Sequence, residues 1–140
     1  MDPPATRLTL PASAESIARF REFVRDGAVA AGVATSDLEK LDLVLEEILI
    51  NVARYAYAPE TGVVEVAYSQ DGPGKLRVEI ADCGRFFNPL EADPPDFSRG
   101  LADRPIGGLG VFLVKSLVES IAYHRAEHRN ILSFTFPNHD

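Results

Sequence analysis

The 140-residue sequence has one cysteine, Cys83, no tryptophan and three histidines. A single thiol excludes an internal disulfide, and a cysteine-based zinc site needs more thiolates. His124, His128 and His139 all lie near the C-terminus, without the spacing of a metal site. These scarcities argue against a disulfide-stabilised domain and against a zinc-centred one.

Long hydrophobic runs and an excess of positive charge are also missing. No apolar stretch approaches the length of a membrane span, and residues 1–6 lack the basic flank and apolar core of a signal peptide. Fourteen basic and 21 acidic residues give a formal net charge of -7. An acidic surface repels phosphate polymers, so nucleic acid and anionic membranes are poor partners. We therefore expect a cytoplasmic protein that binds neither directly.

Length and composition predict one globular domain over residues 1–140, with 46% hydrophobic and 25% charged residues. Hydrophobic periodicity and the positions of glycine and proline predict its elements. They are strands at 7–10, 64–68, 76–80, 121–125 and 131–136, and helices at 13–32, 36–55 and 111–119. Hairpins mixed with helices predict an α+β two-layer sandwich, in which a mixed, mainly antiparallel sheet carries helices on one face.

The boundaries of these elements follow from local signals. Ser13 is a candidate N-cap, and Gly32 is a candidate stop for the first helix. Residues 36–39 have the sequence of a capping box at the start of the second helix. The polar segment 127–130 is predicted to be the turn between the last two strands.

Glu47 and Asn51 form the first candidate for chemistry. They are four residues apart on a predicted helix, so they lie on the same face. Their apolar neighbours in sequence place them at the edge of the buried stripe. Taken alone, the pair is better explained by an exposed acid that hydrogen-bonds an amide on a solvated helix face, because glutamate is common on exposed helices.

A second candidate, Asp82-Cys83-Gly84, directly follows a predicted strand. A carboxylate at a strand end can accept a hydrogen bond from the amino group of a planar ligand, and a nearby glycine permits close approach. Asp-x-Gly is also common in ordinary turns, and alone that explanation is favoured.

The third candidate is the run Gly107-Gly108-Leu109-Gly110 at the start of a predicted helix. Backbone amides at a helix N-terminus can bind phosphate, although this run is neither a Walker A loop nor a dinucleotide fingerprint. The glycines could equally be the hinge of a flexible lid. Residues 83–106, which precede them, contain four prolines and little periodicity, as is typical of a functional loop.

In this order, the three candidates resemble the nucleotide-binding boxes of the superfamily of gyrase, heat-shock-chaperone, histidine-kinase and mismatch-repair ATPases. Within it, the chain is most similar to the small bacterial anti-sigma factor serine/threonine kinases. The similarity spans nearly the whole chain, and it includes residues 51–57, 87–90, 107–118, 123–125 and 130–132.

The resemblance implies a histidine-kinase-like ATPase fold that binds ATP and Mg²⁺. It implies that Asn51 coordinates Mg²⁺, that Asp82 accepts a hydrogen bond from the adenine amino group, and that Gly84 lets the base lie close. Arg54 is implied to reach a phosphate oxygen. The backbone amides implied to hold the phosphates are those of Gly107, Gly108, Leu109 and Gly110.

The resemblance also implies that Glu47 is the general base, which orients a substrate hydroxyl for attack on the γ-phosphate. The chain departs from the family pattern at two positions. It has Tyr55 where histidine is common, and Phe86 where a second glycine or a proline is frequent. Neither departure removes a catalytic group.

Two functions are therefore expected. The first is an anti-sigma regulatory serine/threonine kinase of a partner-switching system, which phosphorylates an antagonist protein and sequesters a sigma factor or a similar regulator. The alternative is a nucleotide-gated protein-binding module without significant kinase activity. The family resemblance further implies a possible homodimer through the first strand and helix. The catalytic half of a histidine kinase is disfavoured because no histidine lies on an N-terminal helix.

Overall fold

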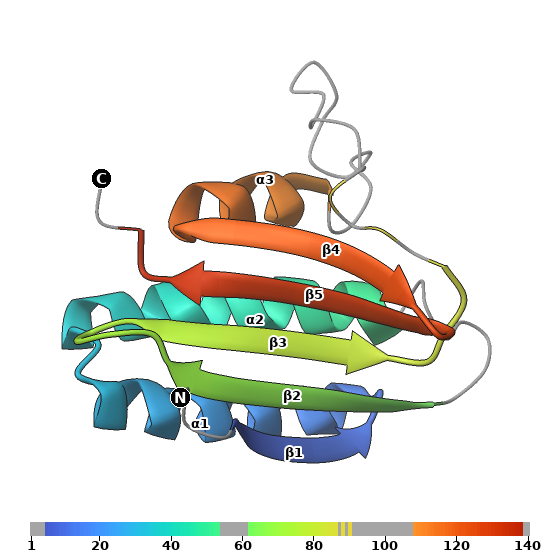
Figure 1. Cartoon of the computed structure of the whole chain (residues 1–140), viewed down its shortest axis with the longest axis horizontal. Helices are drawn as coiled ribbons and strands as arrows, with labels where there is room; N and C mark the ends of the chain where they lie inside the picture. The colour runs from blue at the N-terminus through green and yellow to red at the C-terminus, as the bar shows by residue number, and fades with distance from the viewer. Residues whose placement is uncertain (1–4, 54–61, 87, 89, 91–107, 139–140) are drawn as a thin grey trace.

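The structure is a computed structural model that describes residues 5–53, 62–86, 88, 90 and 108–138 (Figure 1). Its elements follow one another in a mixed order of strands and helices. They are β1 (Thr6–Pro11), α1 (Ala14–Ala31), the 3₁₀ turn η1 (Thr35–Asp37), α2 (Leu38–Asn51), β2 (Val63–Gln70), β3 (Leu76–Asp82), α3 (Gly108–Leu117), β4 (Ser120–Ala126) and β5 (Arg129–Phe136).

The five strands form one sheet in the order β1-β2-β3-β5-β4, and all four neighbouring pairs are antiparallel. Figure 1 shows the three helices together behind this sheet. The predicted α+β sandwich with helices on one face is confirmed. The sheet differs from the expected mixed one only in that each described pair of strands is antiparallel.

Helix α1 has the ends that its sequence predicts. The Ser16 amide donates to Ser13 Oγ at 3.4 Å, and Gly32 ends the helix with a left-handed φ of 87°. Glycine adopts this conformation without the steric cost that a Cβ imposes. The predicted apolar stripe lies in the core, with Phe20 and Val24 fully buried.

The predicted capping box and the predicted last turn are both wrong. The capping box at residues 36–39 is not formed, because the chain enters α2 through the tighter turn η1 and its N-cap, Asp37, makes no side-chain cap bond. The last hairpin turns in only two residues, Glu127 and His128, at φ values of 52° and 66°. Positive φ at both positions matches the twist of the flanking strands, so residues 129 and 130 already belong to β5.

Strand alternation fixes which side chains reach the helices. Leu76, Val78 and Ile80 of β3 are buried, and so are the alternate residues Leu132, Phe134 and Phe136 of β5. Each of these apolar rows ends in a buried polar residue at the same edge of the sheet: Asp82 on β3 and, directly opposite in the register, Asn130 on β5. The apolar core therefore ends at the buried polar pair Asp82 and Asn130.

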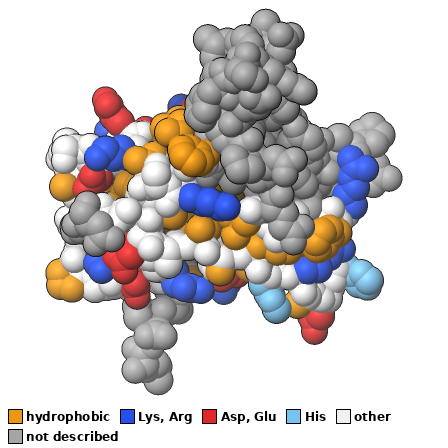
Figure 2. All heavy atoms as spheres, turned by 90° about the horizontal axis from the view of Figure 1, so that it is seen from above, with side chains coloured by type: hydrophobic (Ala, Val, Ile, Leu, Met, Phe, Trp, Pro, Cys, Tyr) orange, Lys and Arg blue, Asp and Glu red, His pale blue; other side chains and the backbone are white. Residues whose placement is uncertain are grey.

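The surface carries several exposed apolar side chains, including Phe112 and Leu113 on α3. On the face in Figure 2, hydrophobic side chains lie in separate groups with basic side chains between them. Within the described ranges, no helix has the length and apolar character needed to cross a membrane.

Candidate functional site

Glu47 and Asn51 lie on the last turns of α2, as the sequence predicts. Because they are one helical turn apart, they face the same hollow, which is also lined by Val114 of α3 and Leu132 of β5. Asn51 is 3% exposed, whereas Glu47 is half-buried. The pair therefore belongs to the wall of a cavity and is not part of a solvated helix face.

The Asn51 Oδ1 atom is buried and has no hydrogen-bond partner among the residues that the structure describes. Buried acceptors are almost always paired, and leaving one unpaired costs about 1–3 kcal/mol. A carbonyl oxygen in this state fits a Mg²⁺ ligand, because Mg²⁺ prefers oxygen and takes few ligands from the protein when it also binds phosphates. Among the residues described, no group of three or more His, Cys, Asp or Glu side chains offers a metal site.

Glu47 has the environment of a general base. Burial raises the pKa of its carboxyl group above the usual value of 4.5, and the charge of Glu46 raises it further. A carboxylate with a raised pKa holds a transferred proton more firmly than an exposed one, which suits proton abstraction from a hydroxyl group.

Asp82 ends β3 with 4% of its surface exposed. Its Oδ1 atom accepts from the Gly84 amide and from Asn130 Nδ2, each at 2.9 Å. Burial raises the pKa of Asp82; the hydrogen bonds from Asn130 and Gly84 and the charges of Arg125 and Arg129 oppose that rise. Both hydrogen bonds end on Oδ1, so the geometry leaves Oδ2 able to accept from a ligand.

A second hollow brings Asp82 next to the first pair. Its polar lining consists of Asp82, Asn130 and Tyr123, and it shares Ile48 and Leu132 with the Glu47–Asn51 hollow. Each hollow has a volume of about 10 Å³, which is enough for one water molecule. They mark buried polar atoms that face vacant space, not the full volume of a nucleotide site. The structure thus gathers two of the three predicted boxes around one apolar wall.

The third box is described in part. Gly107, Arg54 and Tyr55 lie outside the described residues. Helix α3 begins at Gly108, three residues earlier than predicted, so its first turn contains Leu109 and Gly110. The first four amides of a helix have no intrahelical acceptor, and this places the glycine-rich segment where backbone donors are available.

Comparison with known proteins identifies the family of the chain. Residues 10–136 match the histidine kinase-like ATPase domain. The chain belongs to this family. The serine-protein kinase RsbW of Bacillus mycoides (strain KBAB4) is 26% identical over 89% of this chain and 80% of its own length. The serine-protein kinase RsbW of Bacillus cereus (strain AH187) is 28% identical with the same coverage.

A solved structure agrees with the fold. The RsbU and RsbW domains of Rv1364c from Mycobacterium tuberculosis superpose with a TM-score of 0.65 at 20% identity, over 96% of this chain. The chain spans about a third of that longer protein, covering 32% of it. The predicted family and its kinase class are confirmed by the two kinases, and the predicted fold by this structure.

Within this ATPase domain, sequence reasoning missed the interactions of Asn130, Tyr123 and Arg125. These residues supported the resemblance, but none was assigned to the site. The true hairpin register pairs Arg125 with Asn130, and the pairing of β3 with β5 sets Asn130 opposite Asp82. Predicting a two-residue turn would have revealed the pairing of Arg125 with Asn130. The pairing of β3 with β5 joins distant segments, which local sequence patterns do not encode.

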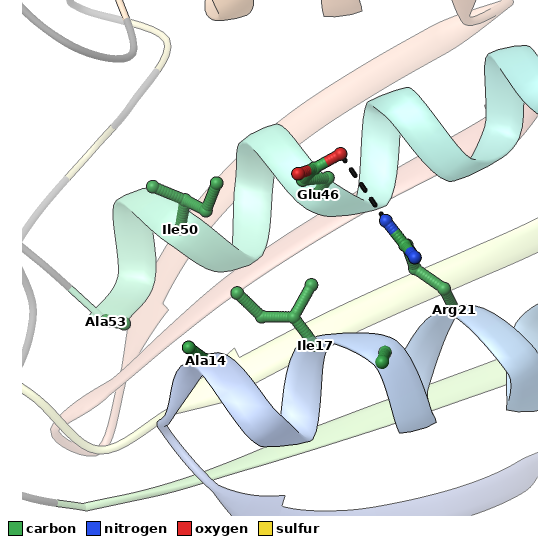
Figure 3. Close-up of a pocket in the computed structure, with 7 residues that line it drawn as sticks. Ala14, Ile17, Arg21, Glu46, Ile50 and Ala53 are labelled. Atoms are coloured by element: carbon green, nitrogen blue, oxygen red, sulfur yellow. Dashed lines mark hydrogen bonds and ion pairs between the residues drawn. The ribbon is translucent and has the colours of Figure 1, made fainter.

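Two further features border the site or lie apart from it. Phe86, one of the two departures from the family pattern, is 60% exposed and meets Tyr123 edge-on, with 5.8 Å between ring centroids. A larger hollow of about 430 Å³ lies between α1 and α2 (Figure 3). The Arg21–Glu46 ion pair, at 3.5 Å, spans it, and none of the predicted site residues that the structure describes lines it.

Proposed function

We propose that this ATPase domain is a partner-switching protein kinase that transfers the γ-phosphate of ATP to a serine or threonine of another protein. The observation that carries the proposal is the pairing of Glu47 with the unpartnered, buried Oδ1 of Asn51 beside a buried Asp82. A general base (Glu47), a metal ligand (Asn51) and an acceptor for the adenine amino group (Asp82) then lie around one shared apolar wall.

Nucleotide recognition is divided between the two hollows. Asp82 Oδ2 accepts the hydrogen bond from the adenine 6-amino group, while Gly84 lies beside the base. The amides of Gly107, Gly108, Leu109 and Gly110 and the Arg54 guanidinium bind phosphate oxygens. Asn51 Oδ1 would ligate Mg²⁺, which when bound neutralises charge on the phosphates.

Glu47 orients the acceptor hydroxyl and takes its proton as the oxygen attacks. A bond forms between that oxygen and the γ-phosphorus, and the bond from the γ-phosphorus to the bridging oxygen of ADP breaks. The half-buried position of Glu47 and its raised pKa suit this transfer. The walls of the cavity mainly position the groups, which is the larger part of catalysis in phosphoryl transfer.

The partners follow from the family resemblance. The phosphoryl acceptor is an anti-sigma-factor antagonist, and the protein bound in the alternative state is a sigma factor or a similar regulator, both in the cytoplasm. The net charge of -7 favours a basic face on the partner. If the chain forms a homodimer through β1 and α1, it must use their outer surfaces, because the apolar stripe of α1 lies in the core.

The test is transfer of radiolabelled phosphate from ATP to a purified anti-sigma-factor antagonist. Glu47→Gln should slow transfer by about 10²–10⁴-fold while ATP binding stays unchanged, because only the base is lost. Glu39→Gln is the matched control: it removes the same charge from an exposed side chain on the same helix, which does not contribute to the raised pKa of Glu47. Equal transfer by wild type and Glu47→Gln would rule out this base.

The exposed Phe112 and Leu113 favour a second candidate, a nucleotide-gated binding module. Both side chains lie on α3, the helix that begins at the phosphate-binding glycines, so a docking surface and the nucleotide site share one element. ATP binding without a phosphorylated product, together with capture of a sigma factor that depends on ATP, would favour this candidate over the kinase.

A further inference from the structure

The side chain of Asn130 is the centre of a hydrogen-bonded cluster behind the Asp82 carboxylate. Its Nδ2 atom donates to Asp82 Oδ1 and to the Arg85 carbonyl, both at 2.9 Å. Its Oδ1 atom accepts from the Tyr123 hydroxyl at 2.6 Å and from the Arg125 guanidinium at 3.0 Å. These four bonds match the two donors and two lone pairs of a carboxamide.

The surroundings of Asn130 allow only one orientation of its amide. The guanidinium of Arg125 can only donate, so it must face the carboxamide oxygen, whereas the Arg85 carbonyl can only accept and must face the nitrogen. Rotation of the amide by 180° would set donor against donor and acceptor against acceptor. Asn130 is also 4% exposed, so water cannot readily replace these partners.

The same cluster holds the turn that follows Asp82. Arg125 donates to the Gly84 carbonyl at 2.8 Å, and the Gly84 amide donates to Asp82 Oδ1. Both polar groups of Gly84 are thereby tied to the carboxylate or to its supports. The turn and the carboxylate form one rigid unit whose outer oxygen, Oδ2, lies away from these bonds.

We propose that Asn130 is a positioning residue for base recognition: it directs Asp82 Oδ2 toward the adenine amino group, and Tyr123 and Arg125 lock Asn130 in the required orientation. The inference rests on the proposed function, because it takes the Asp82 hollow to be the adenine site. Asn130 itself touches no ligand in this scheme. Its effect therefore depends on whether the ligand has the amino group that Asp82 recognises.

The experiment compares the binding of ATP with that of purine riboside 5′-triphosphate, which lacks the 6-amino group, by titration calorimetry. Wild type should prefer ATP by about tenfold or more, the value of one hydrogen bond to a charged acceptor. In Asn130→Ala that preference should fall by about threefold or more, because Asp82 is no longer held. Ser133→Ala, on the opposite face of β5, is the control and should keep the wild-type preference.

The outcomes separate the inference from the proposed function. If Asn130→Ala weakens both nucleotides by the same factor, the positioning role is overturned while the adenine site stands. If wild type binds both nucleotides equally, the Asp82 site itself fails. Should Asn130→Ala not fold, Tyr123→Phe serves instead, because it removes one hydroxyl and keeps the ring that packs on Phe86. A reduced preference supports the inference, and an unchanged one overturns it.

Discussion

The two halves of the candidate site differ in how completely the protein satisfies its own polar groups. Around Asp82, the carboxamide of Asn130 uses its full hydrogen-bonding capacity on protein partners. Around Glu47, the buried Oδ1 of Asn51 has no hydrogen-bond partner within the described part of the chain. Both halves share the apolar wall of Ile48 and Leu132, so burial alone does not explain the difference.

This contrast indicates a division of work. The adenine ring is rigid and always presents the same amino group, so a pre-formed hydrogen-bond acceptor recognises it at little entropic cost. Phosphates and Mg²⁺ arrive together and bring their own charges and ligands, so the protein leaves an oxygen unpaired for them. The unpaired Asn51 oxygen reduces stability, as is common where function requires a group that folding alone would not select.

The largest expected effect of breaking the Asp82 half is on affinity. Asp82→Asn replaces the charged acceptor with a neutral amide, and we expect ATP binding to weaken by about 10–100-fold, because hydrogen bonds to charged groups are worth about 1.5–3 kcal/mol. Titration calorimetry with ATP checks this. Retention of wild-type affinity would show that Asp82 does not contact the base.

The two halves should also respond oppositely when a polar side chain is made apolar. Asn130→Leu leaves the buried Asp82 and the half-buried Tyr123 and Arg125 without their shared partner, so the free energy of unfolding should fall by about 1–3 kcal/mol. Asn51→Leu removes an unpaired acceptor, and the free energy of unfolding should stay level or rise by about 1 kcal/mol. Urea denaturation of both variants measures the difference. Equal losses would remove the contrast between the halves.

A smaller loss of stability is expected from a substitution far from both halves of the site, and it provides a reference for that comparison. Ser13→Ala removes the oxygen that caps α1 and accepts from the Ser16 amide. Its cost should be about 1 kcal/mol in the free energy of unfolding. ATP affinity should not change, because α1 contributes no residue to either hollow. A loss of ATP affinity in this variant would mean that the site depends on general stability.

The smallest expected effect is a pH dependence from Glu47. Its pKa is higher in the folded protein than the usual 4.5, so folding favours the protonated carboxyl group. The stability from protonated Glu47 is fully present below the usual pKa and is lost as pH rises through the raised one. Glu47→Gln should therefore lose less stability than wild type as the pH rises from about 4 through the raised pKa of Glu47. Thermal unfolding across this range measures it, with Glu22→Gln, exposed on α1, as the control.

Local signals in the sequence predicted most of the fold. The apolar stripe from Phe20 to Ala31 and the alternation in β3 identified both layers, because each pattern has the period of its element. The errors lie at boundaries: a 3₁₀ turn replaced the capping box before α2, and the last hairpin has a two-residue turn where four residues were predicted. These depend on backbone conformations to which several local sequences are equally suited.

The candidate site was predictable where its residues follow local rules. Glu47 and Asn51 are one helical turn apart, and Asp82 ends a strand, so their positions required no knowledge of the fold. Asn130 was not predictable as a site residue, because its meeting with Asp82 depends on β5 pairing with β3 across 48 positions of sequence. Long-range pairing of this kind is settled by the packing of the whole core.

The most direct test of the two-part site is titration of ATP with and without Mg²⁺ into wild type, Asp82→Asn and Asn51→Leu. We expect Mg²⁺ to tighten ATP binding to wild type. Asp82→Asn should weaken binding under both conditions and keep the Mg²⁺ increment, whereas Asn51→Leu should lose only that increment. If both variants lost the same affinity under both conditions, or if Asn51→Leu kept the full Mg²⁺ increment, the division of the site would be contradicted.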